Sequence, residues 1–251
     1  MPTDVNMFWH GPKLGPVHSA CVRSFLRHGH TVTMHCYERP SDLPDGTRVF
    51  AARKIMPISE LQPHHETGSV ALGVNRYRYR MIAEGFGLYA DCDMFCLGPI
   101  TDAPYILGKE QDNIINNAFL KFPPESDLAN ALIDATRDYY FIPPWFSSSK
   151  KRRLAFKKRL GRGVHVGQHA WGVWGPQLIS HYVKELGLSS EVAPIDRYYP
   201  VHPWQTTLLS DPGLCISDLA TPRTEAIHLW HKLLSSEAPP HGSPLWEMIN
   251  C

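Results

Sequence analysis

The stretch Gly85-Phe-Gly-Leu-Tyr-Ala-Asp-Cys-Asp93 decides the fold that this sequence predicts. Its apolar run at 87–90 has the length and composition of a buried strand, and Asp91 and Asp93 follow it at once. Two carboxylates are therefore expected at the carboxyl end of a strand. In open α/β sheets ligands bind at this edge, because the strands stop there and the loops begin.

The segments around this stretch predict an α/β domain. The start of the chain has the pattern of a strand, a helix and a second strand, at residues 5–9, 17–28 and 31–37. Such an opening is typical of a sheet covered by helices. We expect further helices at 74–84, 127–140 and 176–185, and short strands at 95–100 and 105–107.

The composition is that of an ordinary globular protein, with 43% hydrophobic and 11% aromatic residues in a chain of 251. This length suits a single large domain spanning residues 1–251. The start of the chain has no apolar core of signal-peptide length, and no segment reaches the ~18 apolar residues of a spanning helix. We therefore expect a cytoplasmic protein.

Asp91 and Asp93 offer hard oxygen ligands of the kind that Mg²⁺ and Mn²⁺ prefer, and substrate phosphates would complete the coordination. A cation held there would act as a Lewis acid and neutralise a departing diphosphate. The same pattern also occurs in solvated turns that follow strands. The pair alone therefore does not decide between a metal site and an ordinary turn.

The sequence Val74-Asn-Arg-Tyr-Arg-Tyr-Arg-Met-Ile-Ala-Glu-Gly-Phe-Gly-Leu-Tyr-Ala-Asp-Cys-Asp93 resembles the sugar-binding region with the DxD motif of glycosyltransferase family 32 and the clostridial glucosylating toxins. That pattern runs Ser-Asp-x-x-Arg-Tyr, a helix, then Gly-Gly-x-Tyr-x-Asp-x-Asp. The matching positions are Arg78, Tyr79, Gly87, Tyr89, Asp91 and Asp93. The resemblance implies a GT-A fold, with a Rossmann-like central mixed sheet flanked by helices.

The resemblance also implies roles for these residues. Asp91 and Asp93 would hold the metal, Arg78 would stabilise charge on the leaving diphosphate, and Tyr89 would belong to the donor site. Asn75 stands where the family has an Asp that contacts hydroxyls of the donor sugar, so it bears on the choice of sugar. Phe86 replaces the first Gly of the pattern.

The late segment Ala226-Ile-His-Leu-Trp-His-Lys232 is similar to the family's His-x-Trp segment. By this resemblance His228 completes the metal shell, and Trp230 and Lys232 approach the diphosphate. An imidazole ligand suits Mn²⁺ somewhat better than Mg²⁺. We expect residues 221–251 to close over the donor site.

Two further segments are similar to donor-binding parts of the family. Phe8 and Trp9 end the first strand, and one of them is expected to stack on uracil, with a preference for Trp9. Asn116 or Asn117 is expected to hydrogen-bond the sugar.

The sequence indicates fewer residues that could contact the acceptor. Gln168 and His169 precede a Gly-Pro turn and are candidates for contact with the acceptor. The run at 147–163 contains eight Lys or Arg residues and no acid, while the rest of the chain has 17 basic against 24 acidic residues. Within the basic segment at 146–163, Lys150 to Arg162 can form either a solvated loop or an amphipathic helix that contacts an anionic membrane.

Together these features predict a retaining, metal-dependent hexosyltransferase. It would move galactose, glucose or an N-acetylhexosamine from a UDP-sugar to a hydroxyl of a glycan or lipid-linked glycan, in bacterial surface polysaccharide or lipopolysaccharide synthesis. Mn²⁺ or Mg²⁺ would be the cofactor, and peripheral contact with the inner face of the cytoplasmic membrane is part of this hypothesis.

Two alternatives remain open at this stage. A metal-dependent phosphohydrolase would combine the Asp pair with some of the 14 histidines, such as those at 64, 65, 165 and 169. A protein that binds nucleic acid or an anionic surface would use the basic run. We expect no nucleic-acid partner, because the rest of the chain is acidic.

Overall fold

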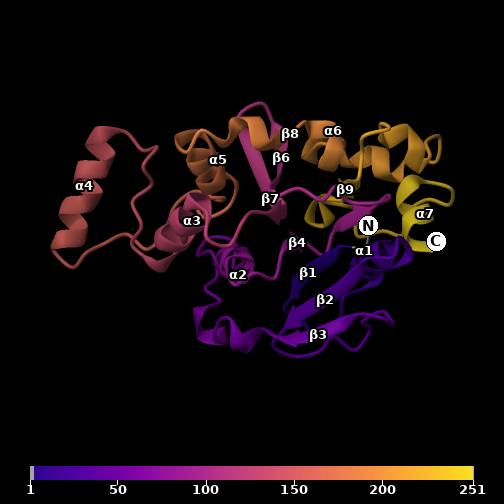
Figure 1. The fold of residues 1–251 in the computed structure, drawn as a ribbon, viewed down its shortest axis with the longest axis horizontal. Helices are drawn as coiled ribbons and strands as arrows, with labels where there is room; N and C mark the ends of the chain where they lie inside the picture. The colour runs from indigo at the N-terminus through magenta and orange to yellow at the C-terminus, as the bar shows by residue number, and fades with distance from the viewer. Residues whose placement is uncertain (1–2, 251) are drawn as a thin grey trace.

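The computed structural model describes residues 3–250 and contains a sheet of seven strands in the order β3-β2-β1-β4-β7-β6-β8 (Figure 1). A second sheet pairs β5 with β9. The strands are β1 (Asp4–Trp9), β2 (Thr31–Cys36), β3 (Arg48–Ala51), β4 (Leu88–Ala90), β5 (Met94–Cys96), β6 (Ile106–Gln111), β7 (Ile114–Lys121), β8 (Val192–Ala193) and β9 (Ala226–His228). The helices are α1 (Pro16–Arg27), α2 (Ala71–Ala83), α3 (Asp127–Arg137), α4 (Ser148–Arg159), α5 (Pro176–Glu185), α6 (Ile195–Tyr198) and α7 (Pro244–Asn250).

The seven-stranded sheet is mixed. Only β7 runs antiparallel to its neighbours β4 and β6, and the other six strands share one direction. Helices cover both faces: α2, α3 and α5 bury one cluster that includes Tyr79 and Leu178, and α1 buries the other, with Phe25 near Met7. Burial on both faces is what a parallel sheet requires. The expected α/β class, a Rossmann-like mixed sheet flanked by helices, is confirmed and is consistent with a GT-A fold.

The opening β1-α1-β2 unit forms where the sequence predicts it. Pro16 occupies the first turn of α1, where its missing N–H costs nothing. Gly29 follows the helix with φ 79°, in the left-handed region that glycine enters without a steric penalty. β1 then pairs in parallel with both β2 and β4. This places Trp9 and Asp91 at the same edge of the sheet.

Four strands have no counterpart among those predicted from the sequence, β3, β7, β8 and β9. β7 contains Asn116 and Asn117, and asparagine is depleted in strands. The strand is nevertheless stable, because it pairs on both sides and because the Asn116 side-chain oxygen accepts a bond from the Ala118 N–H, 2.7 Å away. Tertiary pairing here overrides local propensity.

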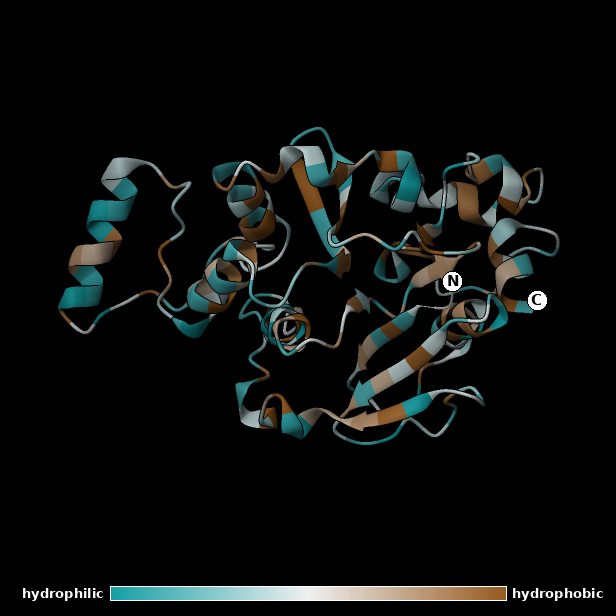
Figure 2. Cartoon of the chain, in the orientation of Figure 1, coloured by the Kyte–Doolittle hydropathy of each residue, from teal (hydrophilic) through white to brown (hydrophobic). Residues whose placement is uncertain are grey.

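Part of the basic segment forms α4, which stands at one end of the molecule (Figure 1), and Figure 2 shows it as mostly hydrophilic. Its apolar side chains divide between two sides of the helix. At 100° per residue, Phe156 and Leu160 lie together on the exposed side, nearly opposite the buried Leu154. Within residues 3–250, no helix combines the length and apolarity needed to cross a bilayer.

Candidate active site

Asp91 and Asp93 lie on the short turn between β4 and β5, at the carboxyl end of β4. The turn is fixed by backbone bonds from Asp91 N–H to the Ala118 carbonyl, 2.7 Å, and from Met94 N–H to the Asp91 carbonyl, 3.0 Å. The two carboxylate side chains remain 28% and 19% exposed. The strand end therefore presents both acids toward the edge where ligands of such sheets bind.

Two neighbours orient the Asp91 carboxylate. The guanidinium of Arg78 donates to Asp91 Oδ1 from 2.9 Å, and the Tyr89 hydroxyl donates to the same oxygen from 2.7 Å. Arg78 is 4% exposed, donates also to the Asn117 carbonyl, and lies 4.4 Å from the centre of the Tyr89 ring. Among residues 3–250, Asp91 Oδ2 has no hydrogen-bond donor. One oxygen is thus held in place and the other remains available.

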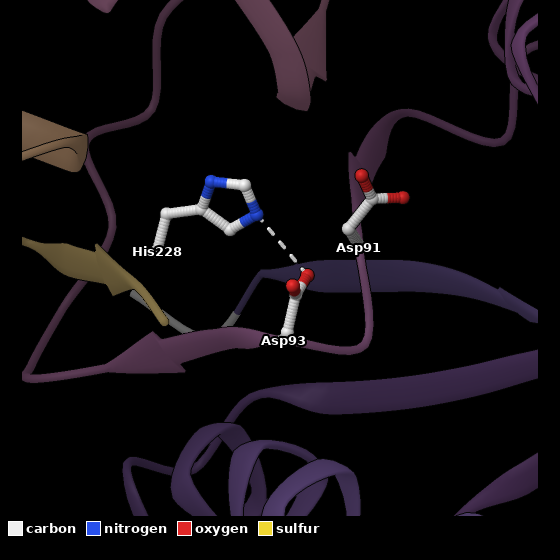
Figure 3. A group of neighbouring side chains, drawn as sticks. All are labelled: Asp91, Asp93 and His228. Atoms are coloured by element: carbon white, nitrogen blue, oxygen red, sulfur yellow. Dashed lines mark hydrogen bonds and ion pairs between the residues drawn. The ribbon is translucent and has the colours of Figure 1, made fainter. Parts of the chain in front are cut away.

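The C-terminal part of the chain reaches the same turn through β9, which pairs with β5 so that His228 faces Met94. His228 Nε2 lies 3.2 Å from Asp93 Oδ1. Trp230 then takes a left-handed conformation, φ 52°, and the following His231 N–H donates to Asp93 Oδ2 from 3.1 Å. Figure 3 shows the side chains of Asp91, Asp93 and His228 around a common space.

The charges of Asp93 and His228 stabilise each other. Burial alone would raise the pKa of the Asp93 carboxyl, but the His228 charge, its hydrogen bond and the His231 N–H outweigh burial and hold that pKa well below its ordinary value. Burial lowers the pKa of His228, and Asp93 more than reverses this, so the pKa of the imidazole is raised. His228 Nδ1 is buried and has no partner among residues 3–250. An orphaned polar atom of this kind is typical of a site that takes up water or a ligand.

These three residues fit a divalent cation. Adjacent ligands of an ion with bonds of about 2.1 Å lie about 3 Å apart, and the Asp93–His228 distance of 3.2 Å has this size. Each of Asp91, Asp93 and His228 offers one ligand atom within 4.8 Å of the other two. Two carboxylates and one imidazole suit Mn²⁺, and they leave room for phosphate oxygens or water.

Comparison with known proteins finds a likeness in structure and none in sequence. No family model matches the chain, and no curated protein matches it in sequence. Among solved structures, the chain is similar to the PaToxG glycosyltransferase. The two share 11% identity, with a TM-score of 0.47, over 76% of this chain and 72% of that one.

Phe8 and Trp9 have different surroundings. Phe8 is buried in the core, with its ring 4.5 Å from that of Tyr77. Trp9 is half-buried at the sheet edge, donates from Nε1 to the Lys13 carbonyl and lies 4.6 Å from the His18 ring. The Phe8 ring is therefore not available to stack on a nucleotide base, because it packs inside the core. Trp9 is the member of the pair whose side chain stays partly exposed at the sheet edge.

The three asparagines predicted in the donor site divide into two kinds. Asn117 donates to Asn75 Oδ1 from 2.9 Å, and both side chains lie beside Gly175, where an added Cβ would come within 3.0 Å of Asn75 Nδ2. Asn116 instead donates to Glu110 from 2.8 Å and bonds its own strand. Asn75 and Asn117 thus form one polar group near Arg78, and Asn116 supports the backbone of β7.

Lys232 and Trp171 connect the C-terminal segment to two other loops. Lys232 Nζ donates to Ser69 Oγ from 2.8 Å and lies 5.4 Å from the centre of the Trp171 ring. The indole of Trp230 packs 4.0 Å from the His228 ring and donates to the Val201 carbonyl. Both predicted diphosphate contacts therefore lie on the segment that carries His228.

Gln168 and His169 lie in and just after the short 3-10 turn Val166–Gln168. Gln168 is exposed and its side chain accepts from the His165 N–H. His169 is buried, its carbonyl accepts from His64, and its Nε2 has no partner among residues 3–250. The loop that continues to Trp171 reaches the side chain of Lys232, so this region adjoins the C-terminal segment.

Two neighbours of the acidic turn, His18 and Tyr199, are not among the site residues predicted from the sequence. His18 lies with its ring 4.1 Å from that of His231, and Tyr199 packs 5.8 Å from His228. Only Tyr199 has a sequence signal, the Tyr-Tyr-Pro segment at 198–200. His18 has none, because it approaches His231 only through the folding of α1 against the segment after β9.

Proposed function

We propose that this chain is a metal-dependent glycosyltransferase that uses Asp91, Asp93 and His228 to hold Mn²⁺ or Mg²⁺ against the diphosphate of a nucleotide sugar. The observation that carries the proposal is the oriented Asp91 carboxylate, with one oxygen fixed by Arg78 and Tyr89, beside the Asp93–His228 pair at a strand end. When bound there, the cation would neutralise the charge that develops on the leaving diphosphate.

In this proposal Arg78 and Tyr89 are positioning residues. The guanidinium of Arg78 is buried beneath Asp91, and both of its terminal nitrogens bond protein oxygens. It would therefore stabilise charge on the diphosphate through Asp91 and through its own positive charge, without a direct phosphate contact. Tyr89 is fully buried and acts through the same carboxylate.

The donor would lie across the edge formed by β1, β4 and the segment after β9. Trp9 would stack on the uracil base of a UDP-sugar. Asn75 and Asn117 would hydrogen-bond hydroxyls of a hexose, since their amides already form one polar group. Lys232 would exchange its bond with Ser69 for a diphosphate oxygen, which would close the segment around residues 228–233 over the donor.

Transfer would proceed with retention of configuration. The bond from the anomeric carbon to the diphosphate oxygen breaks, a bond to the acceptor hydroxyl oxygen forms on the same face, and the hydroxyl proton passes to the departing phosphate. This route requires no carboxylate nucleophile. The acceptor would be a hydroxyl of a glycan or lipid-linked glycan, approached from the side of His169, in the synthesis of bacterial surface polysaccharide or lipopolysaccharide.

Turnover of a panel of UDP-hexoses and UDP-N-acetylhexosamines, with Mn²⁺, Mg²⁺ or EDTA, tests this function. We expect release of UDP from one donor class in the presence of metal, and a loss of at least about 100-fold in the Asp93→Asn variant. Asp112→Asn, which removes one exposed acid from the β6-β7 turn, is the matched control and should keep full activity. Metal-independent turnover, or full activity of Asp93→Asn, is incompatible with the proposal.

A further inference from the structure

α4 is the most basic element of the chain and has no part in the proposed active site. It carries seven Lys or Arg residues and no acid between Ser148 and Arg159. It stands at one end of the molecule, away from the seven-stranded sheet (Figure 1). One side of the helix contacts the preceding segment of the same chain, and the other side faces solvent.

The inner side of α4 is anchored to the segment that precedes it. Leu154 is buried there. Three lysines on this side have partners, which are the Phe146 ring for Lys150 at 3.5 Å, the Pro144 carbonyl for Lys151 at 3.1 Å and the Asp138 carboxylate for Lys158. These contacts fix which side of the helix faces outward.

The outer face of α4 consists of Arg152, Arg153, Phe156, Arg159 and Leu160, where Leu160 is the residue that caps the helix. The helical repeat places these residues on the side opposite Leu154. Phe156 is 65% exposed and Leu160 is 56% exposed. Within residues 3–250, none of the three arginines forms an ion pair. The outer face is thus an exposed apolar pair flanked by uncompensated cations.

We propose that the outer face of α4 docks on an anionic lipid bilayer. The arginines would lie among lipid phosphates, which their planar guanidinium groups can bind in pairs. Phe156 and Leu160 would enter the boundary between headgroups and acyl chains, where an apolar side chain gains by leaving water. The phosphates of a nucleic acid would complement the arginines equally well. They offer no apolar environment to Leu160, however, so the exposed pair Phe156 and Leu160 favours a bilayer.

Binding to vesicles tests this docking surface directly and needs no turnover, so its outcome is independent of the proposed glycosyl transfer. The probes are phosphatidylcholine vesicles with and without phosphatidylglycerol as about one third of the lipid, in co-sedimentation at near-physiological ionic strength. We expect binding to the anionic vesicles alone. Each arginine contributes about fivefold, so the triple variant Arg152→Gln/Arg153→Gln/Arg159→Gln should bind about 100-fold more weakly.

Two further variants separate docking from simple charge attraction. Phe156→Ser/Leu160→Ser keeps every cation and should weaken binding by about tenfold or more. The control Arg27→Gln/Arg39→Gln/Arg48→Gln removes three exposed charges, from α1, the turn after β2 and β3 in that order. It should bind within about twofold of the wild type.

Any of three results overturns the proposal: equal binding of the wild type to the two vesicle types, an equal loss of affinity in the two arginine triples, or wild-type affinity of the serine pair. Tight binding of an oligonucleotide that depends on the outer arginines, without vesicle binding, assigns the surface to nucleic acid instead.

Discussion

Tyr89 and Arg78 share one oxygen of Asp91, and this shared contact decides what a single-atom change at the site should do. Tyr89→Phe removes only the hydroxyl, in a side chain that is otherwise fully buried. Asp91 then rotates more freely, and we expect the affinity for Mn²⁺ to fall by about tenfold with the fold intact. Calorimetric titration with Mn²⁺ measures this, with Tyr140→Phe, an exposed tyrosine, as the control.

An unchanged Mn²⁺ affinity in folded Tyr89→Phe protein would mean that Asp91 needs no hydrogen bond from Tyr89 to bind the metal.

The same titration in Arg78→Lys distinguishes the effect of the positive charge from that of the guanidinium geometry. Lysine keeps the positive charge but has one nitrogen in place of the two that bond Asp91 and the Asn117 carbonyl separately, so we expect a loss at least as large as that of Tyr89→Phe.

At the residue scale, the sequence predicted Asp91, Asp93 and His228 as a group, and the structure places their ligand atoms within 4.8 Å of one another. Their role as metal ligands remains a prediction. What the sequence could not predict is which partner each side chain takes. The Arg78 spacing predicted proximity to the diphosphate site, but only the packing of α2 under the turn shows that Asp91 already receives the guanidinium. The His231 contact is made by a backbone N–H, which carries no residue signal.

At the scale of elements, His35 on β2 forms hydrogen bonds with β1 and with α2. Its Nε2 donates to Asn6 Oδ1 on β1 at 3.0 Å, and its Nδ1 accepts from the Tyr77 hydroxyl on α2 at 2.8 Å. Asn6 Nδ2 donates to the Phe86 carbonyl, which fixes the orientation of the amide and places a proton on His35 Nε2. Burial lowers the pKa of His35 to about 4.

This shift makes stability depend on pH. Between pH 6.5 and about 4 the unfolded chain binds a proton at His35 and the folded chain does not. The free energy of unfolding should therefore fall as the pH is lowered through this window, by about 3 kcal/mol from His35 alone. Urea unfolding between neutral pH and pH 4, in wild type and His35→Gln, measures the difference. Equal losses of stability in the two proteins would remove His35 as the cause.

Gly108 on β6 allows a close approach between the sheet and the tyrosines beside the site. A Cβ at this position would lie 2.6 Å from the Tyr199 ring and 2.8 Å from the Tyr198 ring. We expect Gly108→Ala to lower the free energy of unfolding by about 1–3 kcal/mol, because both rings are buried and cannot move aside. Gly98→Ala, which has no atom within 4 Å of the added Cβ, is the control and should change it by less than about 0.5 kcal/mol. Equal stability of the two variants would show that the rings can yield.

The elements show how far local pattern reaches. The β1-α1-β2 opening, α2 and β4 lie close to the predicted positions, because apolar periodicity and glycine or proline at the ends carry their signal. β7 carries no such signal, and its two asparagines argue against a strand. It forms because β4 and β6 both supply pairing partners from elsewhere in the chain. Local sequence cannot reveal pairing of this kind.

For the whole molecule, α4 is expected to be separable from the domain. Only Leu154 of the helix is buried, and its ion pair with the rest of the chain, Lys158 with Asp138, is partly exposed. Replacing residues 147–162 with a flexible Gly/Ser linker should lower the free energy of unfolding by less than about 2 kcal/mol. Turnover of the nucleotide sugar with a water-soluble acceptor should persist. Failure of this variant to fold would place α4 within the core of a single domain.

The central claim is that Asp91, Asp93 and His228 bind a cation that in turn binds a nucleoside diphosphate. If so, metal and diphosphate must strengthen each other's binding by the same factor. Calorimetric titration of UDP in Mn²⁺ and in EDTA measures that factor directly. We predict at least about tenfold tighter binding with Mn²⁺ in the wild type and in Asp112→Asn, and no enhancement in Asp91→Asn/Asp93→Asn. The same UDP affinity with and without Mn²⁺, or an enhancement that survives loss of both acids, would contradict the account.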